Sequence, residues 1–336
     1  MSFTLKPLDQ QVILITGASS GIGLVTARAA ARQGAAVVLV ARNERALEAA
    51  VAGIEQDGGR ATYAVADVGD PDQLEAAADK AISRFGRIDT WVNNAGVTIY
   101  AKLMETPLVE HQQMVRTNYF GAVNGAILAV ENLRERGGAL IQVGSIASDL
   151  PTPLMGAYAA TKHAVKGYIN SLRAELRAEG APISVTLIKP SGIDTPIGQH
   201  AAAHIPGEAE LPPPVYDPQL VADAILSAAV HPRREVTVGG VGRAQVLIGT
   251  HFPQLLDALS KAMMPLLIDR TARQTPGNSL FASAEAGRER SGVQPHALRH
   301  SAYTAVQLNR GKTALALGLI AGAAGLWLAR RRRSRP

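Results

Sequence analysis

VILITGASSGIG, at residues 12–23, is the stretch that decides the fold of this 336-residue chain. Its apolar first part, residues 12–16, predicts a buried strand, and the residues from Gly21 onward have the composition of a helix. The glycines between them permit a tight turn and let the backbone approach a pyrophosphate, which the N–H groups and positive dipole end of the helix attract. A strand, a glycine loop and a helix in this order predict a dinucleotide site rather than a turn without a ligand.

The same alternation of short apolar strands and helices continues to about residue 240. Further strands are expected at residues 37–40, 62–65, 91–92, 140–143, 183–188 and 235–238, with helices at 21–33, at 43–56 and between Asp70 and Gly86. The strands are continuously apolar, which is typical of a parallel sheet covered on both faces. We therefore predict an α/β fold with one Rossmann-like, doubly wound sheet that binds ligands at the carboxyl ends of its strands, followed by a C-terminal helical extension.

Residues that follow three of these strands are candidates for contact with a dinucleotide cofactor. Ala41 and Arg42 lie where a site that prefers NAD usually has an acid for the ribose 2′-hydroxyl. A cation there would pair with a 2′-phosphate, so NADP(H) is favoured over NAD(H); the alternative is that Arg42 is a solvated residue at a helix start. Asp67 could accept a hydrogen bond from the adenine amino group or cap the next helix, and the sequence leaves both open. The small residues of NNAG, at 93–96, allow a nucleotide to pass closely.

Tyr158 and Lys162 are the candidates for proton transfer. They are four residues apart, so on a helix they share one face. A phenol titrates near pH ~10, and a neighbouring ammonium lowers its pKa, so Tyr158 is expected to act as general acid in reduction and general base in oxidation near neutral pH. Ser145, which follows the fifth expected strand, can hold the substrate oxygen at the same sheet edge. A chance pair of surface residues is the alternative, and the upstream dinucleotide loop argues against it.

Together these motifs resemble the classical short-chain dehydrogenase/reductase family over residues 8–240. The resemblance implies a catalytic tetrad in which Asn118 holds a water that links Lys162 to solvent, and it implies that Lys162 also bonds the nicotinamide ribose. The catalytic residues implied are Asn118, Ser145, Tyr158 and Lys162. The cofactor-binding residues are Gly17, Ser19, Ser20, Gly21, Ile22, Gly23, Arg42, Asp67, Val68, Asn94, Ala95, Gly96, Tyr158, Lys162, Pro190, Gly192, Ile193 and Thr195. The family also favours a dimer or tetramer, so we expect a homo-oligomer.

One position departs from the family pattern. Ser191 follows Pro190 where the family often has glycine, which leaves the geometry of this loop open. The glycine spacing is that of the classical members and not of the extended epimerase-like ones, so sugar-nucleotide chemistry is disfavoured. His200 and His204 lie in an expected substrate loop at residues 198–214, but packing is the favoured role for both. The sequence shows no spacing of metal ligands, and no metal is expected.

Composition excludes several other classes of function. The net charge of +6 comes largely from five arginines among the last seven residues, so the main domain is nearly neutral and a nucleic-acid partner is not expected. The chain contains no cysteine, which excludes disulfides and thiolate chemistry. The N-terminus lacks the pattern of a secretory signal.

The last quarter of the chain has a different pattern, and it sets the expected domain boundaries. We predict a catalytic domain at residues 1–245, an amphipathic helix at 246–270, a linker at 271–311, a membrane-associated or transmembrane helix at 312–330 and a basic tail at 331–336. The 17 uncharged residues 313–329 would span about 25 Å as a helix, slightly less than a hydrocarbon core of roughly 30 Å. The positive-inside rule would keep the arginine tail in the cytoplasm, and the need for NADPH would keep the catalytic domain there too. A single span places its two ends on opposite sides of the membrane, so it cannot satisfy both. Either the tail crosses, or the segment lies shallowly on anionic headgroups.

The leading hypothesis is a membrane-associated NADP(H)-dependent oxidoreductase, with its catalytic domain in the cytoplasm. It would interconvert an alcohol and a ketone or aldehyde, on a substrate that the membrane segment and the apolar helix suggest is lipophilic. A non-catalytic NADPH-binding scaffold or sensor tethered to a membrane is the alternative. A structural membrane protein that oligomerises through its tail is a weaker third hypothesis.

Overall fold

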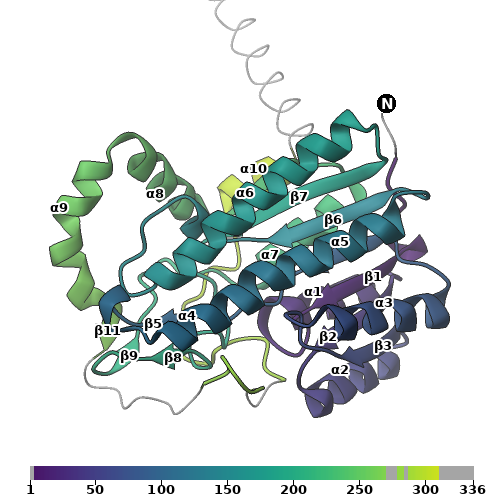
Figure 1. Cartoon of the computed structure of the whole chain (residues 1–336), viewed down its shortest axis with the longest axis horizontal. Helices are drawn as coiled ribbons and strands as arrows, with labels where there is room; N and C mark the ends of the chain where they lie inside the picture. Colours follow the sequence, from purple (N-terminus) through teal and green to yellow (C-terminus); the bar gives the residue numbers. More distant parts are fainter. Residues whose placement is uncertain (1–3, 270–277, 284–286, 310–336) are drawn as a thin grey trace, which may run out of the picture.

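The computed structural model describes residues 4–269, 278–283 and 287–309 of the chain. Seven strands form its central sheet: β1 (Val12–Thr16), β2 (Ala36–Ala41), β3 (Arg60–Val65), β4 (Thr90–Asn93), β6 (Gly138–Val143), β7 (Ile183–Pro190) and β10 (Glu235–Val238). They lie in the order β10-β7-β6-β4-β1-β2-β3, and every pair is parallel (Figure 1). The chain order reverses beside β1, which pairs with β2 on one side and β4 on the other. The predicted Rossmann-like sheet is confirmed, and all seven expected strands belong to it.

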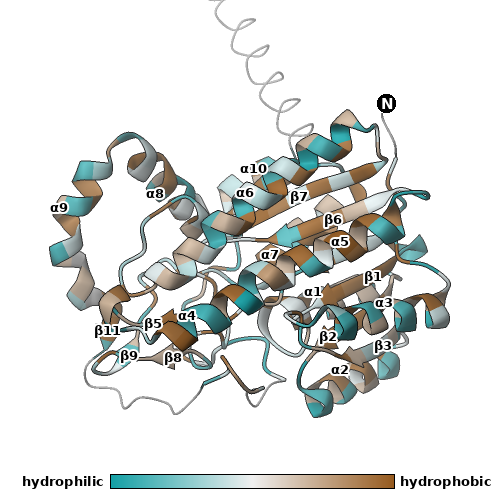
Figure 2. Ribbon diagram, viewed as in Figure 1, coloured by the Kyte–Doolittle hydropathy of each residue, from teal (hydrophilic) through white to brown (hydrophobic). Residues whose placement is uncertain are grey.

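Helices cover both faces of the sheet. One face carries α1 (Gly21–Arg32), α2 (Glu44–Gln56) and α7 (Gln219–Val230), and the other carries α3 (Pro71–Phe85), α5 (Gly121–Leu133) and α6 (Gly156–Ala178). Alternate residues of one strand enter opposite cores: Ile13 and Ile15 pack with the first set, and Val12 and Leu14 with the second. Figure 2 shows the hydrophobic strands enclosed between helices whose outer faces are more hydrophilic.

Local signals in the sequence set the limits of these helices. Asp70 caps α3 by accepting a hydrogen bond from the Gln73 amide, Pro71 occupies the first turn, and Gly86 ends the helix with φ +81°. Asn43 caps α2 in the same way, through the Ala46 amide. These caps place the loops that precede α2 and α3 at the carboxyl edge of the sheet, where the predicted cofactor residues lie.

Shorter elements extend the carboxyl edge. They are β5 (Ile99–Tyr100), β8 (Ala202–Ala203), β9 (Glu208–Ala209), β11 (Ile268–Asp269) and α4 (Leu108–Val115). β5 pairs with β8, and β9 pairs with β11, so the loop expected at residues 198–214 is held by strand pairing at two places.

The structure divides the stretch predicted as one amphipathic helix, 246–270, into two helices. α8 (Gly240–His251) ends before Phe252, whose φ of −133° is not helical, and α9 (Pro253–Met263) begins at the next residue. Pro253 is the physical reason, because it lacks an N–H and restricts the residue before it to extended conformations. The two helices project beyond one end of the sheet (Figure 1).

The segment predicted as a linker, 271–311, packs on the catalytic domain wherever the structure describes it. α10 (Ala302–Leu308) lies against β10, and the carbonyl oxygens of Gln307 and Leu308 accept hydrogen bonds from Arg233. These contacts are made by backbone atoms, polar side chains and a few separate apolar residues such as Leu280 and Leu308. They leave no hydrophobic periodicity, which is why the sequence pattern suggested a detached linker.

The membrane segment and basic tail predicted at 312–330 and 331–336 lie outside the described residues. Within the described part of the chain, no helix combines the length and the apolar character needed to cross a bilayer.

Candidate active site

The glycine-rich loop between β1 and α1 is shaped by close backbone contacts. Gly17 has φ +67°, and a Cβ on it would lie 2.7 Å from the Ala95 Cα. A Cβ on Gly23 would lie 2.3 Å from the Gly17 carbonyl oxygen, so the first turn of α1 packs directly on the loop. Ser19, Ser20, Gly21 and Ile22 line a cavity at this edge together with Gly17.

Thr16, at the end of β1, joins the glycine-rich loop to the loop after β4. Its hydroxyl oxygen accepts hydrogen bonds from the amides of Asn94 (3.0 Å) and Ala95 (3.1 Å). The Asn94 side chain donates in return to the Thr16 carbonyl oxygen, at 2.9 Å. Asn94 therefore fixes the position of Ala95 and Gly96, which line the cavity. Sequence reasoning missed Thr16, although a polar residue ending an apolar strand was a signal for it.

Arg42 and Asp67 both line the cavity, and each has partners within the chain. The Asp67 carboxylate accepts from the Gly69 amide at 2.9 Å, within the turn before α3. The cap of α3 is Asp70 and not Asp67, and the contact of Asp67 with adenine stays a prediction. Arg42 donates through Nη2 to the carbonyl oxygens of Ser279 (2.5 Å) and Ala282 (3.2 Å). Its Nη1 is buried and has no hydrogen-bond partner among the described residues. Val68 lies beside Asp67 in the same cavity wall.

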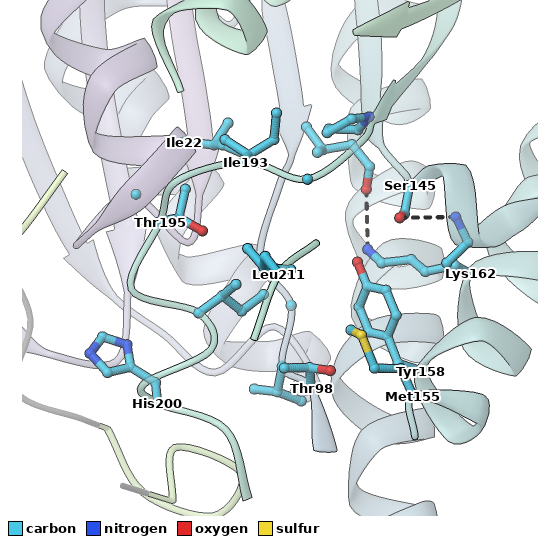
Figure 3. Close-up of a pocket in the computed structure, with 18 of the residues that line it drawn as sticks. Ile22, Thr98, Ser145, Met155, Tyr158, Lys162, Ile193, Thr195, His200 and Leu211 are labelled. Atoms are coloured by element: carbon cyan, nitrogen blue, oxygen red, sulfur yellow. Dashed lines mark hydrogen bonds between the residues drawn. The ribbon is translucent and has the colours of Figure 1, made fainter. Parts of the chain in front are cut away.

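Tyr158 and Lys162 lie on α6 and face the end of β6, as their spacing predicted (Figure 3). Lys162 is only 4% exposed, and its ammonium donates to the Val143 carbonyl oxygen at 3.3 Å. The same Nζ lies 5.4 Å from the centre of the Tyr158 ring. Ser145 follows β6, and its hydroxyl accepts a hydrogen bond from the Ala147 amide at 3.1 Å. The structure thus brings the three predicted residues to one wall of the cavity.

Burial controls the ionisation of both groups. It raises the pKa of Tyr158 to about 12, while hydrogen bonding with the Ser145 hydroxyl acts in the opposite direction. It lowers the pKa of Lys162 to about 8. The expectation of a lowered pKa for Tyr158 is therefore wrong for this state of the protein, because burial removes the phenolate from water and only the hydrogen bond with Ser145 opposes that effect.

Asn118 lies in a π-helical turn, Arg116–Phe120, between α4 and α5. Its side chain is 2% exposed and pairs with both backbone groups of Val97: Oδ1 accepts from the amide (2.8 Å) and Nδ2 donates to the carbonyl oxygen (3.0 Å). Nδ2 also donates to the Thr161 hydroxyl, at 3.1 Å. Asn118 therefore connects the loop after β4 to α6, next to Lys162. Its role in a water relay stays a prediction.

The loop after β7 closes the opposite wall of the cavity, which Pro190, Gly192, Ile193 and Thr195 line. Ser191, the departure from the family pattern, donates a hydrogen bond to the Val238 carbonyl oxygen at 2.9 Å. A Cβ on Gly239 would lie 2.1 Å from the Ser191 Oγ, and one on Gly242 would lie 2.5 Å from the Ser191 Cβ. Glycines at these two positions thus leave the space that the Ser191 side chain fills.

The cavity has a volume of about 460 Å³, and the part that extends away from the glycine loop is lined mainly by apolar side chains, with Thr152, His200, Glu210 and Gln245 among them. The residues that sequence reasoning did not identify there include Leu150, Pro153, Leu154, Met155, Ile197, Leu211, Pro212, Val241, Leu256 and Leu267. Thr98 also lines the cavity; it is 2% exposed, and its buried hydroxyl has no hydrogen-bond partner among the described residues. A signal for these segments was available, because residues 150–155 and 211–214 are irregular and rich in Pro and Leu.

The two histidines of the substrate loop have different positions. His200 lines the cavity (Figure 3), whereas His204 pairs with the carboxylate of Glu110 at 2.8 Å. His163, beside Lys162, is exposed, and its Nδ1 lies 2.9 Å from the Ala159 carbonyl oxygen. The described residues hold no group of three His, Cys, Asp or Glu side chains arranged for a metal ion.

Comparisons with known proteins agree with this geometry. The sequence model of the short chain dehydrogenase family matches residues 11–205. An uncharacterized oxidoreductase of Bacillus subtilis, YxnA, is 45% identical over 263 residues, which are 77% of this chain and 74% of that protein. A 3beta-hydroxysteroid dehydrogenase of Mediterraneibacter gnavus is 33% identical over 204 residues, 60% of this chain and 73% of that protein. An alcohol dehydrogenase of Thermococcus sibiricus, complexed with 5-hydroxy-NADP, has a TM-score of 0.60 at 27% identity, over 68% of this chain and 95% of that one.

Proposed function

The chain belongs to the short chain dehydrogenase family and is an oxidoreductase acting on CH–OH groups, and from this we propose that it reduces a lipophilic ketone or aldehyde with NADPH, using Tyr158 as the acid. The observation that carries the proposal is one continuous cavity, in which the glycine-rich loop lies at one side, Tyr158 and Lys162 in the wall, and apolar side chains around the remainder. The same residues would serve the reverse reaction, oxidation of the alcohol.

The dinucleotide would lie along the carboxyl edge of the sheet. The bare backbone at Gly17 and Gly23 leaves room for a pyrophosphate at the start of α1. Arg42 offers a buried N–H with no hydrogen-bond partner in the described structure, which fits the 2′-phosphate of NADP(H). The 5-hydroxy-NADP bound to the archaeal alcohol dehydrogenase supports this choice. When bound, the nicotinamide supplies the hydride for reduction.

Tyr158 is set up to donate a proton. Because its pKa is raised to about 12, the phenol keeps its proton at neutral pH and can deliver it from the hydroxyl to a carbonyl oxygen as the alcohol forms. Ser145 can hold that oxygen by a hydrogen bond. Lys162, with a pKa of about 8, remains largely charged at neutral pH, so its ammonium stabilises the negative charge that develops on the oxygen of Tyr158.

The substrate class follows from the walls of the cavity beyond Tyr158. Leu154, Met155 and Leu211 supply an apolar surface. The Thr98 side chain, which carries a hydroxyl, lies near Met155 and Leu211 (Figure 3). Such a cavity favours a bulky apolar carbonyl compound that carries a second polar group. The hydroxysteroid dehydrogenase among the relatives supports a substrate of this kind.

The test is to follow NADPH oxidation by absorbance across a panel that pairs small polar carbonyls with sterol-like ketones and long-chain aldehydes. We expect turnover of the bulky apolar members. Turnover confined to the small polar members would refute the substrate class. Turnover that survives Tyr158→Phe would refute the assignment of the acid. Binding of NADPH without turnover of any member of the panel would instead favour the alternative of a cofactor-binding scaffold.

We also propose that residues 312–330 attach the enzyme to a membrane with its catalytic domain on the cytoplasmic side. The uncharged stretch supports this, as do the exposed apolar side chains of Leu247, Phe252 and Leu255 on the projecting helices. The test is flotation with anionic lipid vesicles of the full chain and of a chain that ends at residue 311. Equal flotation of both chains would refute attachment through the tail.

A further inference from the structure

A C-terminal segment lies across the glycine-rich loop. It consists of residues 278–283 and 287–291, which we call the strap. The strap pairs with the loop through two backbone hydrogen bonds: the Gly287 amide donates to the Ser19 carbonyl oxygen, and the Gly21 amide donates to the Arg288 carbonyl oxygen, both at 2.9 Å. Because Ser279 and Ser283 line the same cavity as Ser19 and Gly21, the strap forms part of the cavity wall.

Buried groups hold the strap at both of its ends. At one end Leu280 is 1% exposed and packs among apolar residues that include Val97 and Met114. At the other end the Arg290 guanidinium binds both oxygens of the Asp217 carboxylate, at 2.9 and 3.0 Å. The Asp217 side chain is 6% exposed and the Arg290 side chain is 42% exposed, so a bidentate pair ties the strap to a buried carboxylate. The strap is therefore fixed to the domain and does not lie loosely on its surface.

The strap also orients Arg42. The carbonyl oxygens of Ser279 and Ala282 both accept from Nη2, which fixes one side of the planar guanidinium. Carbonyl groups do not neutralise the charge, and the described residues give Arg42 no carboxylate partner. Nη1 is left buried with an unused donor, which is costly unless a ligand accepts from it. A cation that is held rigidly and lacks an anion is arranged to bind one.

We infer that the strap is a positioning element of the cofactor site, and that selection of the 2′-phosphorylated dinucleotide depends on it. Arg42 supplies the charge, and Ser279 and Ala282 hold that charge in place for the phosphate. This inference rests on the proposed preference for NADP(H). Because coupling between two binding events is reciprocal, the phosphate must also stabilise the docked strap. NADPH should do so, and NADH should do so much less.

The decisive variant is Arg290→Met. It removes an anchor of the strap without replacing Arg42 or any residue of the glycine-rich loop. Calorimetric titration should show about a tenfold weaker Kd for NADPH, toward the low end of measured coupling factors, and a much smaller change for NADH. Arg134→Met is the matched control, because it breaks another arginine–carboxylate pair, with Glu179 at 2.8 Å, on the surface. An equal increase in the Kd for both cofactors, or no increase in either Kd, would overturn the inference.

A second measurement uses the unaltered protein, in case the Arg290 variant does not fold. Trypsin should cleave after Arg288 or Arg290 only when the strap undocks, and NADPH should slow this cleavage about tenfold more than NADH at equal saturation. Equal protection by the two cofactors would overturn the coupling.

Different results would refute the cofactor preference and the role of the strap. If the wild-type protein binds NADPH and NADH equally and Arg42→Ala changes neither, the proposed cofactor preference is wrong and the inference falls with it. If the wild type prefers NADPH and loses that preference in Arg42→Ala but keeps it in Arg290→Met, only the role of the strap is refuted.

Discussion

Replacing Lys162 with methionine should make the protein more stable while it abolishes turnover. Lys162 is buried, and its pKa falls from 10.5 to about 8. That difference corresponds to a cost of about 3 kcal/mol for keeping the ammonium charged in the folded protein at neutral pH. Methionine has a similar length and no charge. It loses the hydrogen bond to the Val143 carbonyl oxygen, worth about 1 kcal/mol, so a net gain of about 2 kcal/mol is expected.

The sign and the pH range of this gain follow from proton binding. Between pH 8 and 10.5 the folded protein binds fewer protons at Lys162 than the unfolded chain does, so wild-type stability rises with pH across this range. The variant lacks this rise. Its advantage should be fully present below about pH 8 and should shrink to roughly zero by about pH 10, where little of the charge cost remains to offset the lost hydrogen bond.

The assay is urea unfolding of the wild type and Lys162→Met at about pH 7 and about pH 10, followed by the fluorescence of the buried Trp91. Lys80→Met, at an exposed position on α3, is the control for the substitution itself. A variant that is less stable than the wild type at neutral pH would refute the reasoning. So would a difference between the two proteins that is the same at both pH values.

Three further outcomes test other parts of the site. Tyr158→Phe should lower kcat for reduction by at least ~10²-fold through loss of the acid and should change the Kd for NADPH little; a kcat within a few-fold of wild type would contradict the assignment. The kcat/KM for reduction should be level at neutral pH and fall as pH rises through about 8, where Lys162 loses its proton, and a profile level to about pH 10 would exclude this role of the ammonium. Gly242→Ala should destabilise the fold by about 1–3 kcal/mol, because its Cβ would lie 2.5 Å from the Ser191 Cβ, and adding Ser191→Gly should restore most of the loss. Urea unfolding of both variants measures this, and the absence of rescue would show that the cost arises elsewhere.

The sheet could be predicted from the sequence because its signals are local. Most strands are largely apolar runs, as in β1 and β2, and capping residues such as Asp70 and Asn43 mark where the helices begin. The candidate catalytic residues could also be identified from the sequence. The spacing of Tyr158 and Lys162 on one helix and the position of Ser145 after a strand are properties of short segments.

Ionisation and long-range packing could not be predicted in the same way. The pKa of Tyr158 depends on burial by segments distant in the sequence, so counting its charged neighbours gave the wrong direction. Arg42 lines the same cavity as the glycine-rich loop, and its contact with a cofactor stays a prediction. The carbonyl groups that hold it come from residues more than 230 positions later, in a segment without periodicity. The break at Pro253 could have been predicted, because a proline after the first residues of a helix stops it.

The strap also bears on how members of this family can be recombined. The part of the chain that the family model matches, residues 11–205, contains Arg42, whereas the carbonyl groups that orient it lie outside that part. A chimaera that received residues 11–205 alone would inherit the candidate catalytic residues and Arg42, but not the carbonyl groups of Ser279 and Ala282 that hold its guanidinium. For this protein, the unit to exchange in cofactor engineering is therefore the matched region together with its own C-terminal strap.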